Sequence, residues 1–143
     1  MISPSKKDFL AIIKDGKIPP LYEEIPYSSP SLIYESLAST NSFLLESVKG
    51  PEKIARYSFI GFDPCLIFKT RNSLIEIESS EKKTIFSNKP LSVLKNLVKT
   101  YRQKPFENLP PFQGGLAGIL SYDFVQYFER LPNNSVDDLN LPD

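Results

Sequence analysis

The stretch from residue 65 to residue 86, CLIFKTRNSLIEIESSEKKTIF, decides the fold class of this chain. Within it, Leu74–Glu78 alternates apolar and acidic side chains with a period of two, which is the pattern of a half-buried strand. The polar residues 79–82 predict a turn, and Thr84–Phe86 predicts a second strand that returns beside the first. Cys65–Thr70 predicts a further strand before this pair. We therefore expect an antiparallel hairpin as the centre of a sheet.

Further strands are expected earlier in the chain. Phe43–Leu45 is a continuous apolar run, short enough for a strand that is buried on both faces. Arg56–Phe62 predicts another strand, and Leu21–Ile25, after two prolines, predicts a short one.

Three helices are expected around these strands. They cover Lys6–Lys14, a segment that starts at Pro30, and Pro90–Tyr101. Ser3 and Ser29 are the predicted N-caps of the first two, because a serine before a proline and an apolar period is typical of a helix start. Strands in hairpins with helices on either side indicate an α+β fold with a largely antiparallel sheet and flanking helices.

The last third of the sequence is less regular. Gly114–Leu120 predicts a glycine-rich strand, and Asp123–Arg130 predicts a short helix or bend. The tail, Pro132–Asp143, is polar and interrupted by proline, as linkers are.

Composition excludes several classes of protein. The 143 residues contain no histidine, so no mechanism that needs an imidazole base or ligand applies. The single cysteine, Cys65, permits neither a disulfide framework nor a cysteine zinc cluster. Seventeen basic and seventeen acidic residues cancel, which gives no reason to expect nucleic acid as a partner. The polar start and the lack of a long apolar run predict a soluble cytoplasmic protein without a membrane partner.

Two features could bind a small ligand. At the end of the apolar run, Glu46 and Ser47 could hold a ligand ammonium group by charge and hydrogen bonds, although an ordinary strand that leaves the core would look the same. Arg56, at the start of the next apolar run, could pair with Glu46 or with a ligand carboxylate, or it could be a surface arginine.

Two other features are less informative. The glycines Gly114, Gly115 and Gly118 lack the spacing of phosphate-binding loops and are better explained by close backbone packing. Asp123 and Glu129 are expected to be solvated, because a metal site would need more ligands. No nucleophile, base and metal set converges, so no catalytic residue is predicted.

Longer strings of sequence resemble the N-terminal region of anthranilate synthase component I, in the chorismate-utilising synthase family. The resemblance rests on Ser42–Ser47, Gly50, Ala55–Gly61, Phe112–Asp123, Phe128–Glu129 and Leu131–Pro132. It implies that residues 1–143 form one part of a two-part α+β sandwich. The catalytic part, which converts chorismate and ammonia to anthranilate with Mg²⁺, would be the C-terminal part and is absent from this sequence. The fragment is therefore expected to be inactive, without a catalytic residue or metal ligand of its own.

The resemblance also implies partners and a site. The partners would be the C-terminal catalytic part, a glutamine amidotransferase subunit and L-tryptophan as feedback inhibitor. The tryptophan site would include Ser47 as the central contact, Glu46 beside it and Leu45 against the indole, with Arg56 nearby. Because part of that pocket would come from the C-terminal part, the fragment is expected to bind tryptophan weakly or not detectably.

Two alternatives remain open at this stage. Aminodeoxychorismate synthase component I shares this N-terminal architecture, and in that enzyme tryptophan can be a buried structural element. A non-catalytic module that binds a small ligand or a partner is the alternative from another class. The exposed apolar surface expected at an interface with the absent part fits either synthase.

Overall fold

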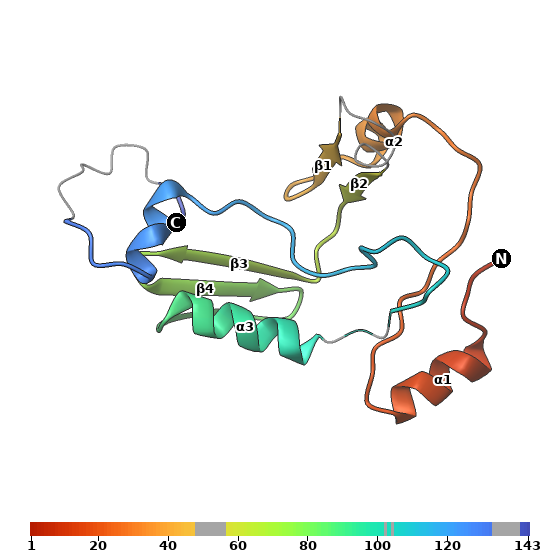
Figure 1. The fold of residues 1–143 in the computed structure, drawn as a ribbon, viewed down its shortest axis with the longest axis horizontal. Coiled ribbons are helices and arrows are strands. Elements are labelled where there is room, and N and C mark those ends of the chain that lie inside the picture. Colours follow the sequence, from red (N-terminus) through yellow and green to blue (C-terminus); the bar gives the residue numbers. More distant parts are fainter. Residues whose placement is uncertain (48–56, 102, 104, 133–140) are drawn as a thin grey trace. The chain divides into compact units, whose positions relative to one another are not determined.

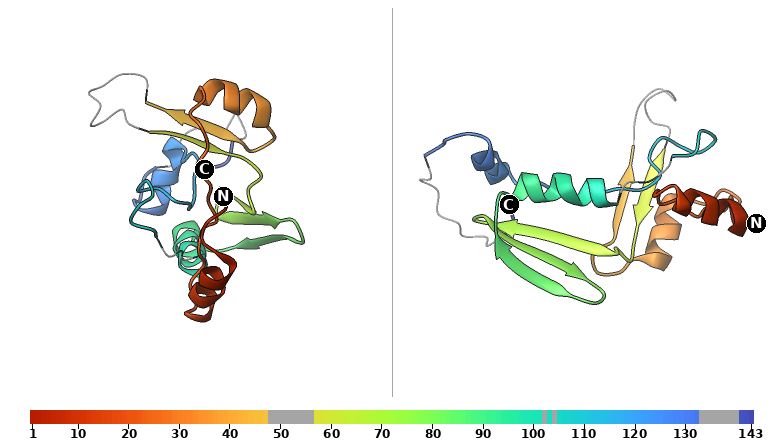
Figure 2. Two further views of the ribbon diagram at one scale, coloured as in Figure 1. Left: turned by 90° about the vertical axis from the view of Figure 1, so that its right-hand side faces the viewer. Right: turned by 90° about the horizontal axis from the view of Figure 1, so that it is seen from below.

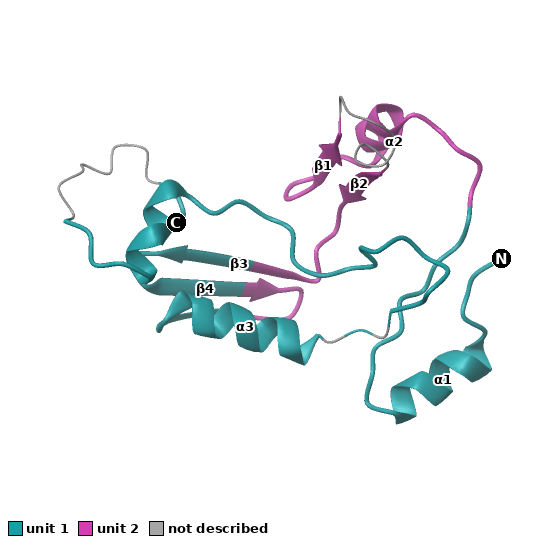
Figure 3. Ribbon diagram, in the orientation of Figure 1, with its two compact units in different colours: residues 1–24, 68–77, 84–143 teal, residues 25–67, 78–83 magenta. Residues whose placement is uncertain are grey.

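The computed structural model describes residues 1–47, 57–101, 103, 105–132 and 141–143 of the chain (Figure 1). These residues divide into two compact units, coloured separately in Figure 3. One unit combines residues 1–24, 68–77 and 84–143, and the other combines residues 25–67 and 78–83. Helices flank antiparallel strand pairs in these units, which confirms the α+β class.

The unit of residues 25–67 and 78–83 contains a strand pair with one helix against it. Strand β1 (Phe43–Glu46) runs antiparallel to β2 (Ser58–Gly61), and helix α2 (Pro30–Leu37) packs against both strands. Pro30 occupies the first turn of α2 as the sequence predicts, but the Ser29 side chain makes no capping hydrogen bond. Tyr34 Oη lies 3.2 Å from Ser42 Oγ, which links the helix to the start of β1.

One expectation for β1 is wrong. The sequence predicts a strand buried on both faces, but 56% of Leu45 is exposed. Among the described residues of this unit a single helix packs against the strand pair, and one helix can cover only one face. The Phe43 ring lies over Gly61, its partner in the register, since a Cβ at Gly61 would lie 2.2 Å from Phe43 Cε1.

The other unit begins with helix α1 (Lys6–Lys14), whose range is the predicted one. Its N-cap is Ser5, whose Oγ accepts a hydrogen bond from the Asp8 backbone N–H at 3.3 Å. Ser3, the predicted cap, instead exchanges two backbone hydrogen bonds with Tyr22, each 2.8 Å long. This isolated bridge stands where the sequence predicts a strand over Leu21–Ile25, so that expectation is wrong.

A three-stranded sheet follows the order β3 (Leu66–Arg71), β4 (Leu74–Ser79) and β5 (Lys83–Ser87). Asn72 and Ser73 join the first two strands with φ values of 50° and 63°. Two successive positive φ values define a type I′ hairpin turn, which matches the natural twist of the strands. The predicted hairpin over residues 74–86 is confirmed.

The sheet carries the best-buried side chain of the described chain, Ile75 in β4, which has no exposed surface. Helix α3 (Pro90–Thr100) runs alongside the sheet, as two directions of view show (Figure 2), and Pro90 at its start is also fully buried. The predicted helix Pro90–Tyr101 is therefore confirmed to within one residue.

The predicted strand Gly114–Leu120 is absent from the structure. The backbone there is irregular, because no described strand pairs with it. A 3₁₀-helix, η1 (Tyr122–Tyr127), follows and agrees with the predicted short helix or bend. The predicted linker lies largely outside the described residues, but its last residue, Asp143, donates its backbone N–H to the Thr70 carbonyl at 2.8 Å.

Candidate functional site

The end of β1 contains three of the four residues that the sequence nominates for ligand binding. Leu45 and Glu46 are the last two residues of the strand, and Ser47 follows directly. All three side chains are exposed. Arg56, the fourth nominated residue, lies outside the described residues. The structure thus presents Leu45, Glu46 and Ser47 to solvent at one strand end.

The strand register fixes what lies opposite each nominated residue. Leu45 pairs with Phe59 and Glu46 pairs with Ser58. Ser58 Oγ donates a long hydrogen bond of 3.5 Å to Glu46 Oε1. Because successive side chains of a strand alternate between faces, Leu45 and Phe59 share one face, while Glu46 and Ser58 share the other. The nominated apolar contact and the nominated carboxylate therefore lie on opposite faces of the pair.

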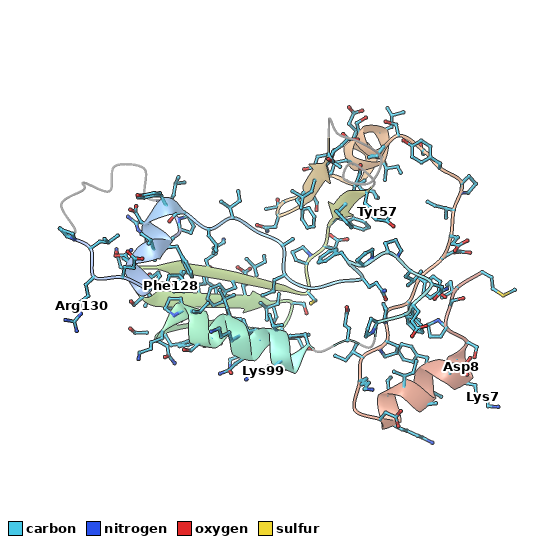
Figure 4. All side chains as sticks on the ribbon, viewed as in Figure 1. Lys7, Asp8, Tyr57, Lys99, Phe128 and Arg130 are labelled. Atoms are coloured by element: carbon cyan, nitrogen blue, oxygen red, sulfur yellow. The ribbon has the colours of Figure 1, made fainter. Side chains whose placement is uncertain are left out.

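Aromatic side chains accompany Leu45. The rings of Tyr57 and Phe59 have centroids 6.2 Å apart and planes tilted by 40°. Tyr57 directly precedes β2, where Figure 4 labels it. The sequence reasoning did not nominate either aromatic residue for the site. The signal that could have found them is strand alternation, since Tyr57 and Phe59 are two residues apart and Phe59 faces Leu45.

This arrangement can bind a flat apolar group. One leucine and two tilted aromatic rings offer apolar area and ring edges, to which aromatic ligands pack well. Glu46 supplies the charge that attracts an ammonium group, and Ser47 adds a hydroxyl at the strand end. The apolar side chains and the Glu46 carboxylate lie on opposite faces of the strand pair. A single ligand can therefore contact both only by wrapping around the end of the pair.

A second cluster of polar groups lies in the other unit, around Tyr127. The Tyr127 hydroxyl accepts the Ser73 backbone N–H at 2.9 Å and donates to the Asp143 carboxylate. The same carboxylate accepts the Asn72 backbone N–H at 2.8 Å. Burial raises the pKa of Tyr127, and the hydrogen bond to Asp143 raises this pKa further, while the Ser73 N–H opposes the rise. These bonds fasten the type I′ turn, while burial and the bond to Asp143 together favour the neutral phenol.

The remaining nominated groups form no metal site within the described ranges. Asp123 and Glu129 are exposed, as expected. Across residues 1–47, 57–101, 103, 105–132 and 141–143, no three His, Cys, Asp or Glu side chains come close enough to hold an ion. The described residues therefore do not fit the Mg²⁺ that the resemblance implies for a whole enzyme. Within the same residues, no helix has the length and apolarity needed to cross a membrane.

Comparison with known proteins finds several relatives that are named anthranilate synthase component 1. Anthranilate synthase component 1 of Acetivibrio thermocellus is 32% identical over the whole chain, and its counterpart in Aquifex aeolicus is 36% identical over 87% of it. The chain belongs to the chorismate-utilising synthase family. Within that family, aminodeoxychorismate synthase component 1 of Bacillus subtilis is also 33% identical over 87% of the chain.

The chain corresponds to a limited region of these synthases. It spans 30% of the length of the Acetivibrio thermocellus protein and 26% of the Aquifex aeolicus and Bacillus subtilis proteins. No protein-family model matches the chain. The relatives support an N-terminal region of a chorismate-utilising synthase of the component 1 type, and both subfamilies appear among them.

Proposed function

We propose that this chain is the N-terminal regulatory region of anthranilate synthase component I and that the end of β1 binds L-tryptophan as a feedback inhibitor. One observation carries the proposal: exposed Leu45 faces Phe59, whose ring lies beside Tyr57, at the strand end that also presents Glu46 and Ser47. An indole suits the apolar side, and an α-ammonium group suits Glu46.

Regulation by this site would be allosteric. A ligand shifts a conformational equilibrium only by the difference in its affinity for the two states. Tryptophan at the strand end would favour an arrangement in which the catalytic part does not act on chorismate. Coupling of this kind typically amounts to about 1–3 kcal/mol. The amidotransferase subunit, the ammonia that it supplies and the Mg²⁺ used by the whole enzyme belong to the same proposal.

The test combines inhibition and direct binding. Anthranilate is fluorescent, so the activity of the full-length synthase that carries this region can be followed with increasing L-tryptophan. Inhibition that is lost in Ser47→Ala and kept in Ser80→Ala, an exposed serine in the β4–β5 turn, supports the proposal. Calorimetric titration of this chain with L-tryptophan and L-phenylalanine shows how much of the site it carries. Inhibition unchanged by Ser47→Ala contradicts the proposed site.

A second candidate is the N-terminal region of aminodeoxychorismate synthase component I. The chain is 33% identical to the Bacillus subtilis aminodeoxychorismate synthase component and 32% identical to the Acetivibrio thermocellus anthranilate synthase component. Sequence identity alone therefore supports the second candidate about as well as the first. The product separates the two, because aminodeoxychorismate needs a lyase before it becomes aromatic. A full-length enzyme that consumes chorismate but forms no anthranilate, and whose product becomes aromatic only after a lyase is added, supports this second candidate. A chain that takes part in neither reaction and still binds a ligand would be the non-catalytic module.

A further inference from the structure

Asparagine followed by serine is a chemically labile dipeptide, and the sequence contains three such pairs. They are Asn41–Ser42, Asn72–Ser73 and Asn134–Ser135, of which the last lies outside the described residues. Asparagine is thermolabile because the backbone nitrogen of the next residue can attack its side-chain amide carbon. A new N–C bond forms, the C–NH₂ bond breaks, and ammonia leaves with the proton of the attacking N–H. Water then opens the succinimide ring to give aspartate or isoaspartate.

The pair Asn72–Ser73 occupies the centre of the type I′ turn between β3 and β4. Asn72 has a φ of 50°, a left-handed conformation that asparagine tolerates better than most residues. Type I′ turns favour asparagine for this reason. The residue that suits the turn is therefore also the residue that can form a succinimide.

The attacking atom would be the Ser73 nitrogen, and a hydrogen bond holds it. Its N–H donates to Tyr127 Oη at 2.9 Å. Ring closure needs this nitrogen to lose its proton, and it also needs rotation about the Cα–C bond of Asn72 to turn the nitrogen toward the side chain. The bond to Tyr127 opposes both steps, because the rotation leaves a part-buried N–H without its acceptor.

Two more hydrogen bonds hold the backbone on either side of the reacting peptide bond. The Asn72 N–H donates to the Asp143 carboxylate at 2.8 Å. The Ser73 carbonyl accepts the Asn88 N–H at 3.2 Å. The turn therefore has to break hydrogen bonds before the ring can close.

Tyr127 is itself fixed in place. Its ring meets that of Phe124 edge-on, with centroids 5.1 Å apart, and its hydroxyl donates to the Asp143 carboxylate. We propose that Asn72 is a site of spontaneous deamidation and that Tyr127 suppresses the reaction by holding the Ser73 nitrogen. These contacts lie within one compact unit, and the protection does not depend on what the protein binds.

Deamidation would make an opening of this turn permanent. Either product carries a new negative charge near the Asp143 carboxylate that holds the Asn72 N–H, and like charges repel. Isoaspartate also adds a carbon atom to the backbone, which a two-residue turn does not accommodate. A modified turn is therefore not expected to regain its original hydrogen bonds.

Peptide mapping by mass spectrometry tests the proposal in the full-length synthase that carries this region. The protein is incubated under mildly alkaline conditions, and aspartate and isoaspartate at each asparagine are followed with time. A synthetic peptide of residues 70–75 is the unprotected reference. Asn72 is expected to convert at least about tenfold more slowly in the protein than in the peptide, because reaction requires local opening.

Tyr127→Phe keeps the ring and removes the acceptor of the Ser73 N–H. Conversion of Asn72 is expected to be about three- to tenfold faster than in wild type, since loss of one hydrogen bond raises the open population by about this factor. Tyr122→Phe removes a hydroxyl from the same 3₁₀-helix and is expected to leave the rate unchanged. Ile12→Val destabilises the same unit through a buried methylene in α1 and is also expected to leave it unchanged.

Asn41 provides a reference within the same molecule. Its φ is 64°, and the N–H of Ser42 donates to the Ser39 carbonyl at 3.2 Å, so this pair is also left-handed and hydrogen-bonded. It lies in the other compact unit. Its rate of conversion is therefore expected to be the same in wild type and Tyr127→Phe.

Four results would overturn the proposal. Equal Asn72 rates in wild type and Tyr127→Phe would exclude a protective role of the hydroxyl. Equal acceleration in Ile12→Val would assign the effect to general loosening of the unit. Conversion in wild type at the rate of the peptide would show that the turn does not protect Asn72, and an inert peptide would show that Asn72 is not labile.

Hydrogen exchange keeps the proposal testable if Tyr127→Phe does not fold. The Ser73 amide of wild type is expected to exchange at least about tenfold more slowly than in the peptide. Exchange at the rate of the peptide would mean that Tyr127 does not hold this nitrogen, and the proposal would fail.

Discussion

Leu45 lies directly opposite Phe59 in the β1–β2 pair, on the face that Glu46 and Ser58 do not share. This relationship divides the nominated site into an apolar side and a charged side. The two sides can therefore be tested by separate substitutions, each with its own expected effect on ligand affinity.

Leu45→Ser is expected to weaken L-tryptophan inhibition of the full-length synthase. Loss of apolar contact area at a half-exposed leucine is worth about 1 kcal/mol, or about fivefold in the dissociation constant. Leu32→Ser in α2, whose leucine is similarly exposed, serves as the control. Equal effects of the two substitutions on inhibition, measured by anthranilate fluorescence, would contradict a role for Leu45 in binding.

Glu46→Gln tests the charged side. Removal of a charged hydrogen-bond partner of the ligand ammonium group is expected to weaken L-tryptophan binding by about 1.5–3 kcal/mol. The free energy of unfolding is expected to change by less than about 0.5 kcal/mol, because Glu46 is exposed and its bond to Ser58 is long. Glu35→Gln, an exposed glutamate in α2, is the control. Calorimetry and urea unfolding provide the two readouts, and tight binding by Glu46→Gln would exclude the ammonium contact.

Tyr127→Phe is expected to lower the free energy of unfolding by about 1–2 kcal/mol. The substitution removes the bond to Asp143 and leaves the Ser73 N–H without its acceptor. Tyr122→Phe in the same 3₁₀-helix is expected to have little effect, because that tyrosine is 90% exposed. Urea unfolding at pH 8 compares the variants, and equal stabilities would show that the turn is not fastened by this hydroxyl.

The same cluster predicts a dependence of stability on alkaline pH. The fold raises the pKa of Tyr127 above its ordinary value of 10.0, so the folded state favours the neutral phenol. The stabilisation that the neutral Tyr127 hydroxyl provides is fully present below about pH 10 and is lost as the pH rises through the folded-state pKa. Wild type is therefore expected to lose more of its unfolding free energy than Tyr127→Phe between pH 9 and about pH 11. Parallel losses in the two proteins would contradict this assignment.

Ser73→Gly is expected to raise the free energy of unfolding by about 0.5 kcal/mol. Ser73 has a φ of 63°, a left-handed conformation that glycine adopts without steric strain and that type I′ turns prefer to fill with glycine. Ser73→Ala retains the Cβ and is the control, with no stabilisation expected. A less stable Ser73→Gly protein in thermal unfolding would mean that the serine side chain itself holds the turn.

Local signals account for what the sequence predicts well. Proline in the first turn locates α2 and α3, and alternation locates the strands of the hairpin. The cap of α1 is misplaced by two residues, because Ser3 and Ser5 are equally suitable caps until Ser3 pairs with Tyr22. Ser3 and Tyr22 are far apart in the sequence, so the residues around Ser3 do not indicate that the two will pair.

The sequence predicted where the candidate site lies in the chain, but not which side chains lie opposite it. Leu45, Glu46 and Ser47 lie at a strand end as expected, whereas Phe59 is brought opposite Leu45 by the register of β2. Register depends on both strands together, so one strand's pattern does not reveal it. Gly114–Leu120 has the pattern of a strand but no described partner, and a strand forms only in pairs.

The contact between Phe43 and Gly61 couples these two positions in evolution. A Cβ at Gly61 would lie 2.2 Å from the Phe43 ring, so a larger residue there requires the ring to move. Replacement of Phe43 by a smaller side chain removes that requirement, and Gly61→Ala is then expected to cost less stability. The two positions are therefore expected to be epistatic, and a library that randomises both together should recover residues larger than glycine at position 61 mainly with small residues at position 43.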